Sequence, residues 1–205
     1  MIKTVVFDLG GVYFENGTKN VIPRLIELIG APEEKVKEIF TTYPYKKEGW
    51  LYRTGKISKH DFWQAAKEKL AINDKQIMEI QKLWHSSYTP MRGMKELVSK
   101  LRKKYKVAAF SGNTKERIEY LDKKYGLMKD FDDYIFSFDA GYNKREKEFY
   151  DILLNKVHCS PEECIFVDDD QHALNLANRC GFKIILFKDR EQLKDELGKL
   201  RVKEW

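Results

Sequence analysis

The stretch VVFDLGG at residues 5–11 holds the main clue to the fold. Its apolar run ends at Asp8 and leads into Gly10 and Gly11, so it predicts a buried strand that enters a turn. After Pro90, further short apolar runs alternate with helical patterns. Such alternation predicts a parallel sheet with helices on both faces, a Rossmann-like α/β core. The first strand must join that sheet, because one strand alone cannot bury its two faces. The other predicted strands lie at residues 107–110, 134–138, 165–167 and 183–187.

The pattern between residues 18 and 88 is helical throughout. Two of its helix starts carry capping pairs, Ser58 with Asp61 and Asn73 with Gln76. We therefore predict a core domain made of residues 1–16 and 90–205, with a helical-bundle cap inserted at residues 17–89.

The composition bounds the function. The chain has 205 residues, of which 42% are apolar and 34% charged, as in an ordinary globular protein. Its three cysteines lack the spacing of a zinc site, and the N-terminus lacks the apolar core of a signal peptide. The net charge of +6 is dispersed and accompanies no nucleic-acid-binding motif. We expect a cytoplasmic protein with neither a membrane nor a nucleic-acid partner, and the sequence predicts no oligomeric state.

Polar residues stand at or after the carboxyl ends of four predicted strands. Asp8 follows the first strand, Ser111-Gly112-Asn113 follows the second, Lys144 lies in the loop after the third, and Asp168-Asp169 follows the fourth. Because ligands of open parallel sheets bind at this edge, we expect these residues to converge. Each also has a plainer interpretation: a turn cap for Asp8, a helix cap for Ser111 and Asn113, and a solvated charge for Lys144.

These residue types suit phosphoryl transfer. Carboxylates at a low-dielectric edge repel one another by about 4 kcal/mol per pair at ~4 Å and an effective dielectric constant of ~20. A hard dication such as Mg²⁺ relieves that repulsion and keeps a substrate phosphate in its shell. Lys144 and the amides near Ser111 would hold phosphoryl oxygens. One carboxylate could then attack phosphorus in line and form an aspartyl-phosphate, which water hydrolyses.

Four motifs in order resemble those of the haloacid dehalogenase superfamily, specifically phosphatase-type members with a helical cap between the first two motifs. They are FDLGGV at 7–12, FSGNT at 110–114, the segment from Ser137 through Lys144 to Phe149-Tyr150, and FVDD at 166–169. The segment YRTGKIS at 52–58 is also similar to family caps. The resemblance implies that Asp8 is the nucleophile and a metal ligand, that Ser111 binds phosphate, and that the second Asp of the Asp168-Asp169 pair reaches the metal.

The resulting site prediction has three parts. We predict Asp8 and Lys144 as catalytic residues, and Mg²⁺ as the cofactor. The predicted phosphate-binding residues are Ser111, Gly112, Asn113 and Lys144; the predicted metal ligands are Asp8, the carbonyl of Gly10, Asp168 and Asp169.

The chain departs from the family pattern at three positions. Gly10 stands where a second Asp usually serves as general acid and base, a role typically worth ~10²–10⁴-fold in rate. Arg145 replaces a proline, and Ala173 replaces a residue that supports the metal. Asp170 could compensate for Ala173, but capping the following helix is its more ordinary role. Three other side chains could act as the acid, although each is also typical of a structural or exposed position: Tyr13, Glu15 and His172.

The leading prediction is a Mg²⁺-dependent phosphomonoester hydrolase acting on a small phosphorylated metabolite, with sugar phosphates as one candidate class. A good leaving group would make the missing acid at Gly10 tolerable. Two alternatives stay open: a metal-independent dehalogenase in which Asp8 displaces halide, and a non-catalytic binding protein that keeps the fold. In the predicted cap, five side chains could form a specificity surface or, as aromatics in small bundles more commonly do, pack as core: Tyr43, Tyr45, Trp50, Tyr52 and Arg53.

Overall fold

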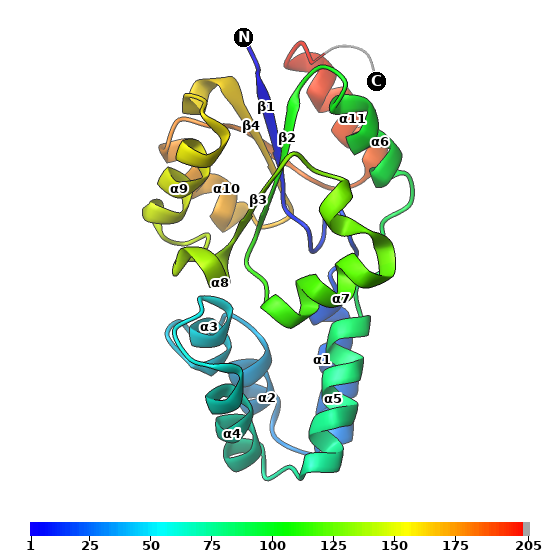
Figure 1. Cartoon of the computed structure of the whole chain (residues 1–205), viewed down its shortest axis with the longest axis vertical. Helices are drawn as coiled ribbons and strands as arrows, with labels where there is room; N and C mark the ends of the chain where they lie inside the picture. Colours follow the sequence, from blue (N-terminus) through cyan, green and yellow to red (C-terminus); the bar gives the residue numbers. More distant parts are fainter. Residues whose placement is uncertain (203–205) are drawn as a thin grey trace.

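The computed structural model describes residues 1–202 and contains one parallel sheet (Figure 1). The strand order is β3-β2-β1-β4-β5, and every neighbouring pair is parallel. This confirms the predicted α/β fold. The strands are β1 (Thr4–Phe7), β2 (Lys106–Ser111), β3 (Asp133–Phe136), β4 (Cys164–Asp168) and β5 (Lys183–Leu186).

The central strand β1 is buried on both faces. Val5 and Phe7 point into one hydrophobic cluster and Val6 into the other, as the two-residue period of a strand requires. Helices α6 (Met94–Leu101), α7 (Lys115–Tyr125) and α11 (Arg190–Lys199) contribute to the first cluster; α9 (Lys147–Val157) and α10 (Gln171–Arg179) contribute to the second. Both faces of the sheet are thus covered, which explains why its strands read as continuous apolar runs.

The third strand is shorter than predicted. We expected residues 134–138 to be a strand, but Ser137 begins the short helix α8 (Ser137–Ala140). The Ser137 hydroxyl donates a hydrogen bond to the carbonyl of Arg53, in the helical segment below the sheet. This contact accompanies the turn of the chain at the carboxyl edge, so the apolar pattern alone overestimated the strand. The remaining short helices are η1 (Leu127–Lys129) and η2 (Pro161–Glu163).

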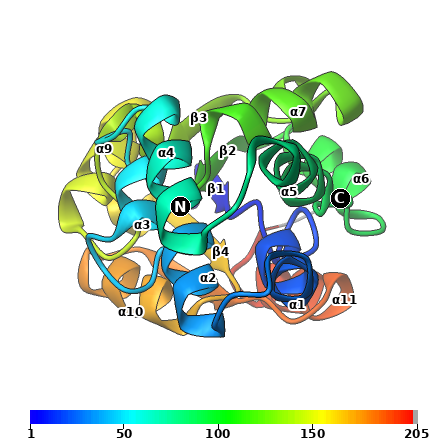
Figure 2. The same ribbon diagram turned by 90° about the horizontal axis from the view of Figure 1, so that it is seen from below.

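Residues 17–89, which we call the helical segment, lie beyond the carboxyl ends of the strands (Figures 1 and 2). They share a separate hydrophobic cluster built around Phe40, Phe62 and Trp84. Both predicted caps are confirmed: Ser58 accepts a hydrogen bond from the amide of Asp61, and Asn73 forms a capping box. The helices are α1 (Gly17–Ile29), α2 (Glu33–Phe40), α3 (Glu48–Arg53), α4 (Lys59–Leu70) and α5 (Asp74–Ser86).

The helical segment is tied to the sheet by polar contacts. The Tyr52 hydroxyl donates to the carboxylate of Glu116 on α7, and the Tyr45 hydroxyl donates to Glu146 at 3.1 Å. Gly55, at a φ of 66°, approaches the carbonyl of Phe138 so closely that a Cβ would lie 2.3 Å from that oxygen. A larger residue at position 55 would therefore separate the two parts of the molecule.

Candidate active site

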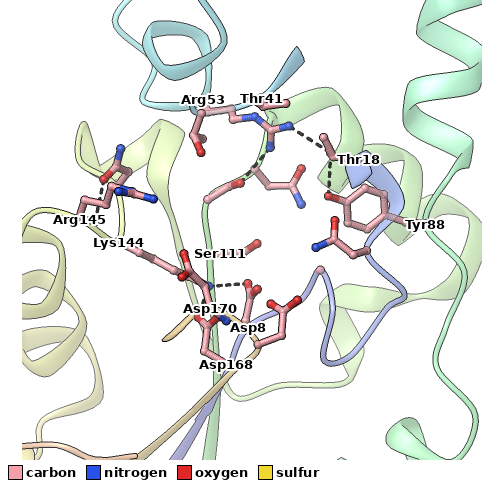
Figure 3. A pocket seen from close by; sticks show the side chains of 17 residues that line it. Asp8, Thr18, Thr41, Arg53, Tyr88, Ser111, Lys144, Arg145, Asp168 and Asp170 are labelled. Atoms are coloured by element: carbon pink, nitrogen blue, oxygen red, sulfur yellow. Dashed lines mark hydrogen bonds and ion pairs between the residues drawn. The ribbon is translucent and has the colours of Figure 1, made fainter. Parts of the chain in front are cut away.

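Asp8, Lys144 and Asp168 meet at the carboxyl edge of the sheet (Figure 3). Asp8 follows β1, Asp168 ends β4, and Lys144 reaches both from the loop between α8 and α9. The Lys144 Nζ lies 2.7 Å from Asp8 Oδ1 and 2.6 Å from Asp168 Oδ2. The Tyr150 hydroxyl lies 2.9 Å from the carbonyl oxygen of Lys144 and thereby fixes the loop. The three predicted residues therefore form one ion-paired group.

Burial sets the protonation behaviour of this group. Asp8 is 8% exposed and Asp168 is fully buried. Burial raises the pKa of both carboxyls, although Lys144 opposes that shift. For Lys144, burial favours loss of the proton, but the carboxylates of Asp168 and Asp8 outweigh it and raise its pKa. Burial thus favours the protonated form of these carboxyls, and a bound cation would favour their charged form instead.

A third carboxylate, that of Asp169, joins Asp8 and Asp168. One ligand atom from each residue lies within 4.8 Å of the others. Gly11 makes this approach possible: at a φ of 94°, a Cβ on it would stand 2.2 Å from Asp169 Oδ2. An all-oxygen donor set of this kind fits Mg²⁺. Gly10 lines the same pocket with its backbone.

Ser111, Gly112 and Asn113 line the opposite wall of the group, directly after β2. Asn113 is already engaged: its Oδ1 accepts from the Arg117 guanidinium at 3.0 Å, and its backbone N–H donates to Ser137 Oγ at 3.2 Å. Asn113 therefore holds α7 in place, which is closer to the plainer structural interpretation. Ser111 lines the pocket at the end of its strand and is 2% exposed.

A cleft of about 240 Å³ extends from the carboxylates to the helical segment. Of the five cap side chains predicted as a specificity surface or core, Arg53 lines this cleft. Trp50 and Tyr52 are buried, whereas Tyr43 and Tyr45 are exposed. Sequence reasoning missed several other lining residues: Asn16, Thr18, Thr41, Thr42, Tyr88 and Asn143.

Tyr88 occupies the space that a side chain at position 10 would need. A Cβ on Gly10 would lie 3.0 Å from Tyr88 Cε1 and 3.2 Å from its hydroxyl oxygen. That hydroxyl lies 3.1 Å from Thr18 Oγ1. Burial favours a higher pKa for Tyr88, but Arg117 and Arg53 outweigh it and lower the pKa. The ring of Tyr88, at the end of the helical segment, therefore lies against Gly10 where a side chain at position 10 would otherwise be.

The other departures have local explanations. The backbone N–H of Arg145 donates to Asn143 Oδ1 at 2.8 Å, a bond that proline could not make. Ala173 is 1% exposed and packs in the second hydrophobic cluster. Asp170 caps α10 by accepting from the amide of His172, as its ordinary role predicts.

The three substitute acids do not line the cleft. Tyr13 donates to Asp130 at 2.8 Å, which together with burial raises its pKa, while Glu15 and His172 are exposed.

A family model described as haloacid dehalogenase-like hydrolase matches residues 2–181. The chain belongs to this family. This hydrolase is 23% identical over 201 residues to a D-ribitol-5-phosphate phosphatase of Bacteroides thetaiotaomicron, a match that covers 89% of this chain and 90% of the relative.

Solved structures agree with the fold of this hydrolase. A haloacid dehalogenase family enzyme of Bacteroides thetaiotaomicron, a mutant in complex with magnesium and inorganic phosphate, matches with a TM-score of 0.79 and 22% identity over 92% of this chain and 95% of that one. The L-2-haloacid dehalogenase of Xanthobacter autotrophicus, with chloropropionic acid covalently bound, matches with a TM-score of 0.66 and 19% identity over 99% of this chain and 85% of that one. These neighbours share the fold of this chain.

Among residues 1–202, no helix combines the length and the apolar character needed to cross a lipid bilayer.

Proposed function

We propose that this hydrolase is a Mg²⁺-dependent phosphatase of small phosphorylated metabolites. The observation that carries the proposal is the cluster of Asp8, Asp168 and Asp169, in which Lys144 bridges the first two carboxylates, both of them buried. A dehalogenase without metal has no use for three such carboxylates, since they would repel an anionic substrate. The magnesium-bound family structure and the ribitol-phosphate phosphatase relative support the same choice.

The chemistry follows from the placement of the groups. Asp8 attacks phosphorus while the bond to the leaving oxygen breaks, which yields an aspartyl-phosphate and an alkoxide that takes its proton from solvent. Lys144 and Ser111 bind phosphoryl oxygens and orient the group for in-line attack. Water then attacks the phosphorus of the intermediate and the bond from phosphorus to the Asp8 oxygen breaks, which regenerates Asp8 and releases inorganic phosphate together with the proton of the water.

Magnesium would be held by Asp8, Asp168, Asp169 and the carbonyl of Gly10. When bound, it supplies positive charge that screens the phosphate from the carboxylates. We also propose that residues 1–16 and 90–205 form the catalytic domain, and that residues 17–89 form a cap whose movement controls access.

The absence of an acidic side chain at Gly10 limits the range of good substrates. No carboxylate from this position can protonate the leaving oxygen, so we propose that substrates with good leaving groups, such as anomeric sugar phosphates or acyl phosphates, react fastest. Comparable kcat values for matched aryl and alkyl phosphates would contradict this part of the proposal.

The test is hydrolysis of p-nitrophenyl phosphate with Mg²⁺, with chelator, and by Asp8→Asn. Its leaving group needs little acid assistance, so Gly10 does not mask a competent nucleophile. We expect turnover that requires Mg²⁺ and is lost in Asp8→Asn. Asp189→Asn is the matched control, because Asp189 caps α11 outside the cleft and asparagine caps a helix as well as aspartate does, so this variant should remain active. Absence of turnover would overturn the proposal, and chelator-resistant release of halide from 2-chloropropionate would favour the dehalogenase.

A further inference from the structure

Arg53 presents a buried guanidinium to the cleft, on the side away from the carboxylates (Figure 3). It ends α3 and is 4% exposed. Its Nη1 donates to the carbonyl of Gly112 at 3.0 Å, and its Nη2 donates to Thr18 Oγ1 at 3.2 Å and to the carbonyl of Phe40 at 3.0 Å. Among residues 1–202, its buried Nε finds no hydrogen-bond partner. All three acceptors are uncharged, and the group that attracts the Arg53 charge most is the Tyr88 phenol rather than a carboxylate.

A second buried cation, Arg117, lies nearby. It is fully buried and donates to Asn113 Oδ1 and to the carbonyl of Trp84, which are again neutral acceptors. Both guanidinium groups lie over the Trp84 ring, at 5.5 Å for Arg53 and 4.5 Å for Arg117. Burial lowers the pKa of Arg117 to about 9; attraction to Tyr88 opposes this shift, and repulsion from Arg53 adds to it.

Neither arginine has a carboxylate within ion-pair distance anywhere in residues 1–202. Keeping a positive charge buried without an anion costs free energy, and a bound anion removes that cost. Arg53 is the one of the two that lines the cleft, so a ligand can reach it there.

The direction of attack indicates which part of a substrate Arg53 meets. In an in-line displacement the leaving oxygen stands across phosphorus from the attacking Asp8. Figure 3 shows Arg53, with Thr41, on the side of the cleft opposite Asp8. The leaving group therefore extends toward Arg53, while Lys144 and Ser111 face the phosphoryl group.

We infer that Arg53 is a specificity residue that binds an anionic oxygen group on the leaving-group part of the substrate, so that the substrate is a phosphomonoester with a second anionic end. That end is a carboxylate or a second phosphoryl group. The inference rests on the proposed phosphatase function and narrows its substrate class. A neutral polyol phosphate would offer only hydroxyl acceptors and leave the charge of Arg53 uncompensated.

The test is calorimetric binding of three non-hydrolysable phosphonates to the Mg²⁺-loaded protein. 3-Hydroxypropylphosphonate has a neutral end, 3-phosphonopropanoate ends in a carboxylate, and propane-1,3-diphosphonate ends in a second phosphonate. We expect the wild-type protein to prefer one anionic ligand over the neutral one by about ten- to a hundred-fold, the range that a charged hydrogen bond supplies. Which of the two anionic ligands binds more tightly shows whether the second anionic end of the substrate is a carboxylate or a phosphoryl group.

Two variants of Arg53 and one control variant test whether Arg53 causes the preference for an anionic phosphonate. Arg53→Met should abolish the preference, and Arg53→Lys, which keeps the charge, should retain part of it. Tyr52→Phe removes the neighbouring contact with Glu116 without altering the cleft, so it controls for a loosened helical segment and should keep the full preference. If Arg53→Met does not fold, the wild-type ligand series and Arg53→Lys still decide.

Three outcomes would overturn the inference. Equal wild-type affinities for the three phosphonates would do so, as would an equal loss for all three in Arg53→Met, which would place Arg53 on the phosphoryl group. If no phosphonate binds and p-nitrophenyl phosphate is not hydrolysed, the proposed function fails and the inference fails with it. If p-nitrophenyl phosphate is hydrolysed but the phosphonates bind with equal affinity, the inference about Arg53 is refuted and the proposed phosphatase function is not.

Discussion

A Lys144→Met substitution removes the ammonium group that bridges the carboxylates of Asp8 and Asp168. Their oxygens lie within 4.8 Å of one another, so at an effective dielectric constant of ~20 the repulsion that Lys144 now offsets is at least about 3 kcal/mol. Breaking a buried ion pair by removing one partner typically costs about 3–5 kcal/mol. We expect the free energy of unfolding at about pH 8 to fall by this amount when no metal is present.

The sign of the pH dependence follows from the raised carboxyl pKa values. A carboxyl whose pKa is higher in the folded protein binds extra protons there, so its contribution to stability is present at low pH and lost as the pH rises through the folded pKa. For Asp168 that folded pKa is about 7 with Lys144 present, and removing the cation raises it further. The deficit of Lys144→Met should therefore shrink toward about pH 5, and saturating Mg²⁺ should reduce it at about pH 8.

The assay is urea unfolding followed by circular dichroism at both pH values, with and without Mg²⁺. Lys147→Met is the matched control: its ion pair with Asp151 is exposed, so its loss should cost less than about 1 kcal/mol. A deficit in Lys144→Met that is independent of pH, or no larger than that of the control, would refute the electrostatic explanation.

Three further substitutions test local features. Gly10→Asp should lower the free energy of unfolding by about 1–3 kcal/mol, because its Cβ would press on Tyr88. In urea unfolding, the effects of Gly10→Asp and Tyr88→Ala should be non-additive in the double variant. Simple additivity would disprove the contact. Gly11→Ala would displace Asp169 and should weaken Mg²⁺ binding at least about tenfold by calorimetry, whereas unchanged affinity would remove Asp169 from the metal site. Asn73→Ala removes the capping box of α5 and should lower the free energy of unfolding by about 1 kcal/mol without changing catalysis; an altered kcat would mean that α5 acts on the site.

Short apolar runs and the polar residues that end them were sufficient to predict the sheet and the residues at its carboxyl edge. Apolar runs that end in Asp8, Ser111 and Asp168 identify strands and their polar ends, and parallel topology then brings those ends together. The same signals failed at Ser137, which begins helix α8 and whose hydroxyl contacts Arg53, a residue distant in sequence. Propensity contains no information about such a partner.

The residues by which the helical segment lines the cleft were harder to predict from the sequence. In the sequence, Tyr88 is only the last residue of the helical pattern at 18–88, and its contact with Gly10 depends on how the helical segment is placed relative to the sheet. Trp50 and Tyr43 are both aromatic, yet one is 2% and the other 70% exposed. Burial within a small bundle is decided by packing between helices, which spacing along one helix does not determine.

The position of β1 at the centre of the sheet has a consequence for synthesis on the ribosome. Thr4 pairs with Lys106 on one side and with Cys164 on the other, so neither neighbour of β1 exists until the chain has grown by about a hundred residues. At about 5–20 residues per second, that interval lasts roughly 5–20 seconds. Residues 17–89 form a contiguous set of helices with their own hydrophobic cluster and can collapse during that time. The segment that can collapse first is thus the one inserted after Asp8, and it is complete while β1 still lacks both of its partner strands.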